Sequence, residues 1–229
     1  MNRKKIIITG ASRGLGFELV KELHQEYDII ATATSKIGLT KIQEAFPGVI
    51  VRILDLGEID TIEKFVHEFH DSIYALINNA ATTCFDYFLD IDFNQARKKI
   101  DINFLNTAFL TQMIVKNNLT RIKRIVNISS ASTKKIKEGM SLYSSSKASL
   151  EVFSKVIAKE LANLGILVNS VLPGYMKTDM TSHLKDTSMI SLNRFAKTAE
   201  ISGLVHFLLS EKASYITGQN FVIDGGLTN

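Results

Sequence analysis

Short apolar runs alternate along this chain with longer stretches in which apolar residues recur every three or four positions. The short runs, rich in Ile and Val, are typical of buried strands, and the periodic stretches of helices with one apolar face. The predicted strands cover residues 5–9, 28–34, 49–56, 74–80, 124–130, 166–173 and 220–226. The predicted helices cover residues 16–26, 38–46, 58–71, 92–117, 142–163 and 198–209.

The strand runs are apolar on both faces, which indicates strands covered by helices on each side. Regular strand–helix alternation predicts right-handed crossovers between parallel strands. We therefore expect an α/β fold, in which residues 1–229 form a single domain with a doubly wound, seven-stranded parallel sheet flanked by helices. No repeat or Pro/Gly/Ser-rich linker divides the sequence.

The composition is that of a soluble globular protein, with 45% hydrophobic and 22% charged residues. Cys84 is the only cysteine, which excludes an internal disulfide. No apolar run is long enough for a signal sequence or a membrane span. The net charge of +4 includes a basic cluster at 134–137, which has no interleaved aromatic residues and is therefore interpreted as a solvated loop. We expect a cytoplasmic protein with neither nucleic-acid nor membrane partners.

Two further groups of residues favour structural interpretations. His67 and His70 lie three positions apart on a predicted helix, but the sequence places no third ligand beside them, so we expect a solvated helix face and no metal site. Cys84 and the aromatic residues at 85, 87 and 88 lie after a predicted strand. They could face a substrate, but a packed thiol is the favoured interpretation of Cys84, and the three aromatic residues could equally belong to the core.

A glycine-rich turn, "TGASRGLG" (9–16), directly follows the first predicted strand and opens the first helix. Gly10, Gly14 and Gly16 allow a tight turn and a close approach of the backbone to a ligand. The helix N-terminus behind them favours a negative charge. In this strand–turn–helix context, the motif predicts a binding site for the pyrophosphate of a dinucleotide.

The G-x-x-x-G-x-G spacing of this turn resembles the short-chain dehydrogenase/reductase family, which has a Rossmann-type fold. Its motifs are matched from Thr9 to Gly226, and stretches such as "TATS" and "YITG" are similar to those of bacterial 3-oxoacyl-acyl-carrier-protein reductases. The resemblance implies a nicotinamide cofactor held by Gly10, Ser12, Arg13, Gly14, Leu15, Gly16, Thr32, Asp55, Leu56, Asn79, Ala80, Tyr143, Lys147, Pro173, Gly174, Met176 and Thr178.

The region after the second strand, "ATATSK" (31–36), predicts which nicotinamide cofactor is bound. It has no carboxylate to hold a ribose 2′-hydroxyl. Arg13, with Thr32 and Lys36, could instead meet the 2′-phosphate of NADPH, because Arg and Lys both suit phosphate. A solvated loop residue is the alternative for Arg13. We expect NADPH/NADP as the cofactor and reduction as the direction.

Two motif positions have a second interpretation or depart from the family pattern. Asp55 in "LDL" resembles the family's adenine contact, while a plain helix N-cap would explain it almost as well. In "NNAA" (78–81), Ala81 stands where the family has glycine. Its methyl group could tighten the cofactor site.

Tyr143 and Lys147 lie four positions apart in "YSSSK", so in a helix both side chains share one face. Chance alone predicts about half of one such pair in this composition. A phenol with its ordinary pKa of about 10 is a poor acid at neutral pH, and a nearby ammonium lowers that pKa by favouring phenolate. The spacing therefore suits a catalytic acid beside a cation that tunes it.

Ser130 and Asn103 complete the resemblance to the family's catalytic group. Ser130 ends a predicted strand thirteen residues before Tyr143, and Asn103 lies on the predicted helix 92–117. By resemblance, Tyr143 is the general acid, Lys147 also holds the nicotinamide ribose, Ser130 donates to the substrate oxygen, and Asn103 holds a water that relays protons. Taken singly, polar residues at a strand end or on a helix remain ordinary structural features.

Residues 179–195 are expected to form a substrate lid, about six residues shorter than is typical of the similar reductases. By resemblance, basic residues near the site bind an acidic carrier protein. Arg121 matches one of them, but Leu164 stands at the other. Acyl carrier protein is therefore a possible partner, alongside a small-molecule or acyl-thioester ketone. The resemblance also implies a homotetramer or homodimer built through helices 92–117 and 142–163 and the last strand.

Three functions follow from the sequence. The first is NADPH-dependent reduction of a ketone to a secondary alcohol, with a 3-oxoacyl thioester as the favoured substrate. The second is reduction of another ketone, such as a sugar or a secondary-metabolite intermediate, which the short lid and Leu164 favour. The third is an NADP-binding regulatory protein without turnover, which would not need Tyr143 as an acid.

Overall fold

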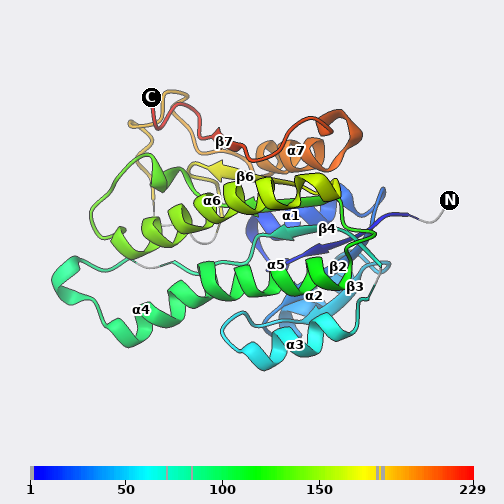
Figure 1. Cartoon of the computed structure of the whole chain (residues 1–229). Coiled ribbons are helices and arrows are strands. Elements are labelled where there is room, and N and C mark those ends of the chain that lie inside the picture. The colour runs from blue at the N-terminus through cyan, green and yellow to red at the C-terminus, as the bar shows by residue number, and fades with distance from the viewer. Residues whose placement is uncertain (1–2, 71, 84, 179–180, 182–183) are drawn as a thin grey trace.

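The computed structural model describes residues 3–70, 72–83, 85–178, 181 and 184–229. Its centre is one parallel sheet with the strand order β3-β2-β1-β4-β5-β6-β7 (Figure 1). The strands are β1 (Lys5–Ile8), β2 (Asp28–Ala33), β3 (Ile50–Ile53), β4 (Ile73–Asn78), β5 (Arg124–Ile128), β6 (Leu167–Pro173) and β7 (Asn220–Ile223). The predicted doubly wound, seven-stranded parallel sheet is confirmed.

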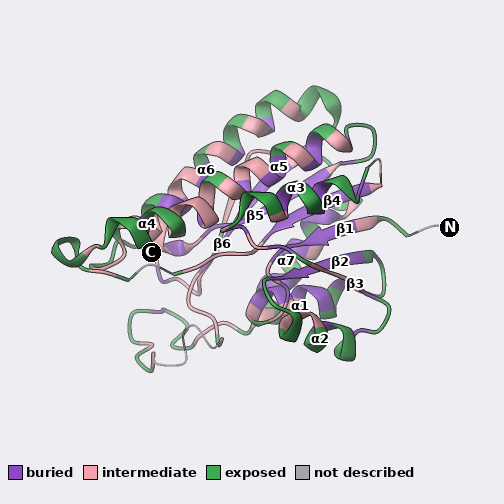
Figure 2. Ribbon diagram, turned by 90° about the horizontal axis from the view of Figure 1, so that it is seen from below, coloured by how far each residue is buried: buried purple, intermediate pink, exposed green. Residues whose placement is uncertain are grey.

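Helices cover both faces of the sheet, which is why its central strands are buried on both sides (Figure 2). One face carries α1 (Gly14–Leu23), α2 (Lys36–Ala45) and α7 (Thr198–Leu209). The other face carries α3 (Ile59–His67), α5 (Asn106–Asn117) and α6 (Ser141–Leu161). A shorter helix, α4 (Phe93–Ile100), precedes α5 and extends beyond the sheet (Figure 1).

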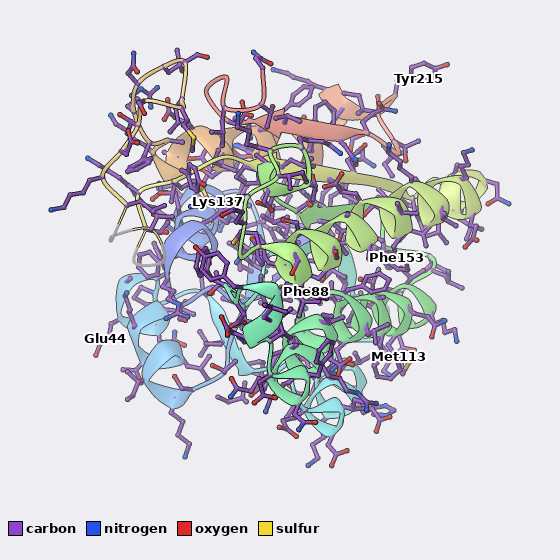
Figure 3. The ribbon with its side chains drawn as sticks, turned by 90° about the vertical axis from the view of Figure 1, so that its left-hand side faces the viewer. Glu44, Phe88, Met113, Lys137, Phe153 and Tyr215 are labelled. Atoms are coloured by element: carbon purple, nitrogen blue, oxygen red, sulfur yellow. The ribbon has the colours of Figure 1, made fainter. Side chains whose placement is uncertain are left out.

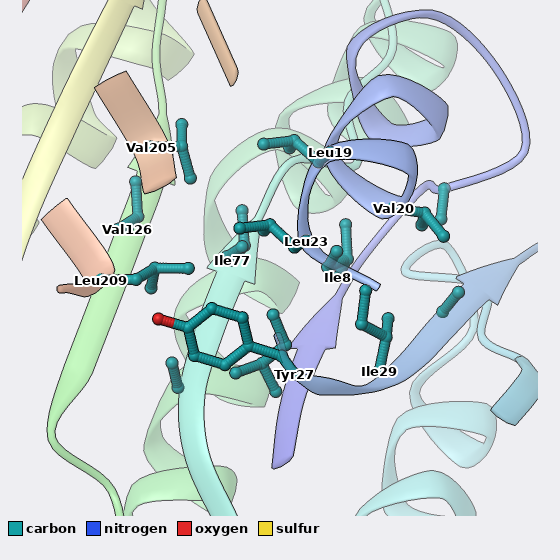
Figure 4. Close-up of a cluster of buried hydrophobic side chains, with 14 of the residues drawn as sticks. Ile8, Leu19, Val20, Leu23, Tyr27, Ile29, Ile77, Val126, Val205 and Leu209 are labelled. Carbon is teal, nitrogen blue, oxygen red and sulfur yellow. The ribbon is translucent and has the colours of Figure 1, made fainter. Parts of the chain in front are cut away.

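Each face has its own apolar core. On the α1 side, Leu19 and Leu23 pack with Val205 and Leu209 of α7 against strand residues such as Ile77 (Figure 4). These side chains are at most 1% exposed. Burying a Leu or Val side chain contributes about 1.5–3 kcal/mol, so the two helices hold the β1–α1 turn firmly in place.

The prediction of a single continuous helix over residues 92–117 is wrong. The segment consists of α4, a π-helical turn over Asp101–Leu105 and then α5. In this turn Thr107 Oγ1 donates to the carbonyl of Ile102, five residues earlier, at 2.8 Å. The wider turn contains the buried Asn103, whose side chain bonds to the loop after β4. The other predicted elements are present, with ends displaced by a few residues.

Candidate active site

The predicted site residues follow the carboxyl ends of the central strands. The glycine-rich turn follows β1, Asn79 and Ala80 follow β4, Ser130 follows β5, and Gly174 follows β6. The strand order reverses between β1 and β4, and ligands of doubly wound folds bind outside the strand ends at such a switch point. The fold therefore brings these separate motifs to one edge of the sheet.

The glycine-rich turn packs directly on the segment after β4. A Cβ atom added to Gly10, whose φ is +65°, would lie 2.8 Å from the Ala80 Cα, and one added to Gly16 would lie 2.2 Å from the Gly10 carbonyl oxygen. Asn79 Nδ2 donates to the carbonyls of Thr9 and Gly10 at 2.9 and 3.1 Å. The Asn79 side chain thus fixes the shape of the turn, a role that the sequence motif alone did not indicate.

The start of α1 fits an anionic ligand. Arg13 is exposed at the N-cap, no side chain caps the helix, and its first turn contains no acidic residue. A Cβ atom on Gly14 would be in ordinary van der Waals contact with the Thr178 side chain, at 3.5 Å, so the turn lies beside the loop after β6. The Thr32 hydroxyl is buried and has no hydrogen-bond partner. An uncapped helix N-terminus, a glycine-rich turn and a free arginine are features that a phosphate-bearing dinucleotide would satisfy.

Other residues predicted to bind the cofactor border the same turn. Ser12 lies against α2, because a Cβ atom on Gly38 would be 3.0 Å from the Ser12 Cβ. Asp55 Oδ1 accepts the Gly57 amide at 2.8 Å. The alternative N-cap interpretation of Asp55 is wrong, since Glu58 is the N-cap of α3. Leu15 and Leu56 are buried behind these contacts.

Lys147 is an ammonium group held inside the protein. Only 2% of the residue is exposed, and its Nζ donates to the Ile128 carbonyl at 2.8 Å. Burial lowers the pKa of this lysine from 10.5 to about 8 because desolvation disfavours the charged form. The group nevertheless remains mostly protonated at pH 7, with further N–H groups to donate.

Tyr143 lies one turn before Lys147 in α6, as the spacing predicts. It is half-buried, and its carbonyl accepts a hydrogen bond from Ser146 Oγ at 2.7 Å. Ser130 caps a short 3₁₀ helix, η3 (Ala131–Thr133), by accepting the Ser132 amide at 3.1 Å. Because Ser130 Oγ is the acceptor in that bond, its own proton remains available for donation.

Asn103 is connected to both the loop after β4 and helix α6. Its Oδ1 accepts the Thr82 amide at 2.8 Å, and its Nδ2 donates to the Thr82 carbonyl at 2.9 Å and to Ser146 Oγ at 3.2 Å. Both amide protons are therefore used, which leaves one lone pair of Oδ1 for the predicted water. Ser146, which links Asn103 to the Tyr143 carbonyl, was not predicted from the sequence.

The residues after β6 border the site from the other side. Pro173 ends the strand, and a Cβ atom on Gly174 would lie 2.8 Å from the Asp224 Cα. Thr181 Oγ1 donates to the Met176 carbonyl and lies 3.3 Å from Thr178 Oγ1. These contacts hold the segment that contains the predicted cofactor residues Met176 and Thr178.

The predicted lid, 179–195, divides into two parts. Residues 179, 180, 182 and 183 lie outside the described residues. The second part is anchored, because Ile190 is 2% exposed and the Leu192 amide donates to the Gly225 carbonyl at 3.1 Å. These contacts fix the part of the predicted lid from Ile190 onwards.

The candidate substrate opening has an apolar side. Phe85, Tyr87 and Phe88 are all exposed, and the ring of Phe85 packs against Gly139 of the loop after η3. Lys137 lies over the same ring, with its Nζ 5.9 Å from the ring centroid. Figure 3 views this end of the molecule, with Phe88 and Lys137 labelled. Cys84, also considered as a substrate contact, lies outside the described residues.

No group of three or more His, Cys, Asp or Glu side chains in the described part of the chain is arranged to hold a metal ion. Within the same residues, no helix is both long and apolar enough to cross a membrane.

Known proteins resemble this chain over almost its whole length. The family profile described as "Enoyl-(Acyl carrier protein) reductase" matches residues 10–228. The 3-oxoacyl-[acyl-carrier-protein] reductase of Buchnera aphidicola (subspecies Schizaphis graminum) is 34% identical, over 99% of this chain and 98% of the relative. A solved "short chain dehydrogenase/reductase family protein" superposes with a TM-score of 0.94 at 28% identity, covering 99% and 98% of the two chains.

A second solved structure, a 4-hydroxyisoleucine dehydrogenase complexed with NADH, has a TM-score of 0.91 at 29% identity and covers 99% of each chain. The matches therefore include proteins named for different substrates on one fold. The sheet order β3-β2-β1-β4-β5-β6-β7 and the doubly wound fold agree with these full-length similarities. The chain belongs to the short-chain dehydrogenase/reductase family and is an oxidoreductase of that class.

Proposed function

We propose that this enzyme reduces a ketone to a secondary alcohol with NADPH, and that a 3-oxoacyl thioester is the substrate. The observation that carries the proposal is the buried, bonded ammonium of Lys147 one helical turn from Tyr143. A buried charge is costly unless it is paired and hydrogen-bonded, and the Ile128 carbonyl is a neutral acceptor that offsets only part of that cost. Here the positive charge would favour the phenolate left when the tyrosine one turn away gives up its proton.

Each of the four proposed catalytic residues has a separate role in the reaction. When bound, the nicotinamide supplies the hydride for the carbonyl carbon. Tyr143 gives its proton to the carbonyl oxygen, and the Lys147 charge stabilises the phenolate left behind. Ser130 donates a hydrogen bond to the same oxygen as negative charge develops there. Asn103 holds a water through which the proton lost by Tyr143 is replaced.

The cofactor residues are proposed from their positions around the turn after β1. Gly10, Ser12, Gly14, Leu15 and Gly16 would bring the backbone and the α1 N-terminus to the pyrophosphate. Asp55, Leu56, Asn79 and Ala80 would border the adenosine, and Pro173, Gly174, Met176 and Thr178 the nicotinamide. Tyr143 and Lys147 would also hold the nicotinamide ribose.

NADPH is favoured over NADH by the charge next to this turn. Arg13 is exposed and makes no capping bond, and Lys36 begins the neighbouring helix α2. Both cations are free to meet a 2′-phosphate, and the Thr32 hydroxyl lacks a partner. The 4-hydroxyisoleucine dehydrogenase bound to NADH makes a direct comparison of the two cofactors necessary.

The substrate class is supported by the names of the full-length relatives, several of which are 3-oxoacyl-[acyl-carrier-protein] reductases. A second substrate class, a sugar or secondary-metabolite ketone, is favoured by Leu164. It is 45% exposed and stands where a basic residue would be expected for an acidic carrier protein. Of the two positions at which a basic residue would bind an acidic carrier protein, only Arg121 carries a positive charge, and it is exposed.

We also propose that the chain self-associates through α4 and α6, as a dimer or a tetramer. Phe93 on α4, Leu105 at the end of the π-helical turn, and Val152 and Val156 on α6 are all apolar and exposed. Phe153 of α6, labelled in Figure 3, also packs edge-on against Phe104, at 6.1 Å between ring centroids. Exposed apolar residues gathered on adjacent helices are typical of an interface.

Absorbance loss of the reduced cofactor tests the activity, with NADPH and NADH in parallel. The substrates are a short 3-oxoacyl thioester, the same acyl group on an acyl carrier protein, and a keto sugar. We expect NADPH oxidation with the thioester. Turnover of the keto sugar alone would replace the substrate assignment, and no turnover with any ketone, despite NADPH binding, would contradict the enzyme mechanism.

A further inference from the structure

Glu151 is a buried carboxylate that the proposed reaction does not use. It lies one turn after Lys147 and two turns after Tyr143 on α6, and only 4% of the residue is exposed. Carboxylates are rarely buried, because leaving water is costly unless the charge is paired and hydrogen-bonded. A charge at this point of the helix therefore requires an explanation.

Both oxygens of Glu151 are bonded to other elements. Oε1 accepts Ser129 Oγ at 2.8 Å. Oε2 accepts Lys134 Nζ at 2.8 Å and Asn220 Nδ2 at 2.9 Å. The carboxylate thus joins α6 to the end of β5, to the loop after η3 and to β7. The Lys134 side chain is 43% exposed, so this ion pair extends from the interior to the surface.

These partners lie on either side of Ser130 in the chain. Ser129 directly precedes it and follows Ile128, whose carbonyl holds the Lys147 ammonium. Lys134 is the C-cap of η3, the short helix whose N-cap is Ser130, and its amide donates to the Ala131 carbonyl at 2.9 Å. A single carboxylate therefore fixes both ends of the turn that carries the Ser130 hydroxyl.

We propose that Glu151, paired with Lys134, is a positioning residue for Ser130 and for the loop 131–141. The proposal rests on the proposed ketone reduction, in which Ser130 touches the substrate oxygen. Glu151 itself touches no reacting atom and acts through Ser129 and Lys134. Catalytic groups need placement within about 0.5 Å, and a turn held only at its N-cap would give Ser130 a wider range of positions.

The first test is Glu151→Gln, which keeps the size of the side chain and an acceptor for Ser129 but removes the charge that holds Lys134. We expect kcat to fall roughly 10- to 100-fold, with an unchanged KM for NADPH. Hydrogen exchange of the backbone amides of residues 132–135 should become faster. Glu160→Gln, on an exposed position of the same helix, is the matched control and should change neither quantity.

A double variant separates positioning from stability. Removing one partner of a buried pair destabilises a protein, whereas replacing both with apolar residues is often neutral. Glu151→Gln with Lys134→Met removes both charges and keeps an acceptor for Ser129 Oγ, which Glu151→Leu would leave unpaired. It should recover the Tm lost in Glu151→Gln, while kcat stays low. Recovery of kcat together with Tm would overturn the proposal, as would a Glu151→Gln variant with a kcat within twofold of the wild type.

The exchange measurement does not depend on turnover. If the wild-type protein reduced none of the ketones, the proposed function would fail, but the anchoring of residues 130–134 would still be tested. Faster exchange at 132–135 in Glu151→Gln would support it, and unchanged exchange would overturn it. Lys134→Arg, which keeps the charge, should behave like the wild type in both measurements.

Discussion

The Lys147 ammonium donates a 2.8 Å hydrogen bond to the carbonyl of Ile128, the last residue of β5. Ser130 follows two residues later, and Tyr143 lies one turn before Lys147 on α6. The bond therefore ties the helix that carries the proposed acid to the strand end that carries the proposed hydroxyl donor. The positions of Lys147, Tyr143 and Ser130 are therefore fixed relative to one another by α6, by the end of β5 and by the hydrogen bond between them.

The buried position of Lys147 should reduce stability at neutral pH. Its pKa is about 8 in the folded protein and 10.5 as its ordinary value, so the unfolded chain binds the proton more readily and the charged lysine opposes folding below pH 8. Lys147→Met should remove this cost, which is on the order of 3 kcal/mol. The difference in unfolding free energy between the variant and the wild type should decrease as the pH rises from 8 to 10.5, because folded wild-type Lys147 loses its proton in this range.

Chemical denaturation of the cofactor-free protein at pH 7 and pH 10.5 measures this difference. Lys155→Met, an exposed position on the same helix, is the control and should show little pH dependence. The same difference in unfolding free energy between wild type and Lys147→Met at both pH values would show that burial does not perturb Lys147.

Arg13 should determine the preference for NADPH. The Arg13 side chain makes no capping hydrogen bond to α1, so Arg13→Ala should leave the helix intact. The variant should lose only the binding energy of the contact between Arg13 and the 2′-phosphate. A charged hydrogen bond is worth about 1.5–3 kcal/mol, which predicts a Kd for NADPH roughly 10- to 100-fold higher and an unchanged Kd for NADH. Fluorescence titration of both cofactors measures this, with the exposed Arg3→Ala as the control. Equal weakening of both cofactors would assign Arg13 to the shared pyrophosphate.

Charge on the exposed side of α6 should disrupt self-association. Val152 and Val156 are 63% and 48% exposed and lie one turn apart. Val152→Lys with Val156→Lys should shift the solution mass towards that of the 25.5 kDa chain, because buried unpaired charges are costly. Light scattering coupled to size exclusion measures the mass, and Tyr215→Lys, at a fully exposed position, is the control. An unchanged oligomer would exclude this side of α6 from the interface.

The fold could be predicted because each strand is a short apolar run followed by a helix or turn signal. Sequence analysis missed the π-helical turn at Asp101–Leu105, since its i-to-i+5 bonds leave no periodic signal in so short a segment. That turn contains Asn103, whose amide bonds to Thr82 across the β4 loop. Such a long-range pairing depends on the tertiary fold and cannot be read from local spacing.

The motif residues were predicted by resemblance, whereas their supporting residues were not. Ser129, Ser146 and Glu151 resemble ordinary polar positions in the sequence, and only the fold reveals their partners. Glu151 did leave a signal: it follows Tyr143 and Lys147 at the same four-residue spacing, which places a carboxylate on a face that packs against the sheet. The anchored second half of the predicted lid likewise depends on its contacts with Gly225 and Gly226.

Tyr143→Phe tests the central claim most directly, because it removes one hydroxyl and leaves the ring. General acid catalysis contributes about 10²- to 10⁴-fold, so we predict that NADPH oxidation with the accepted ketone falls by at least about 100-fold. The Kd for NADPH should remain close to the wild-type value, and Tyr215→Phe, at an exposed position, should turn over normally. If Tyr143→Phe reduced the ketone at the wild-type rate, Tyr143 would not be the acid and the proposed mechanism would be wrong.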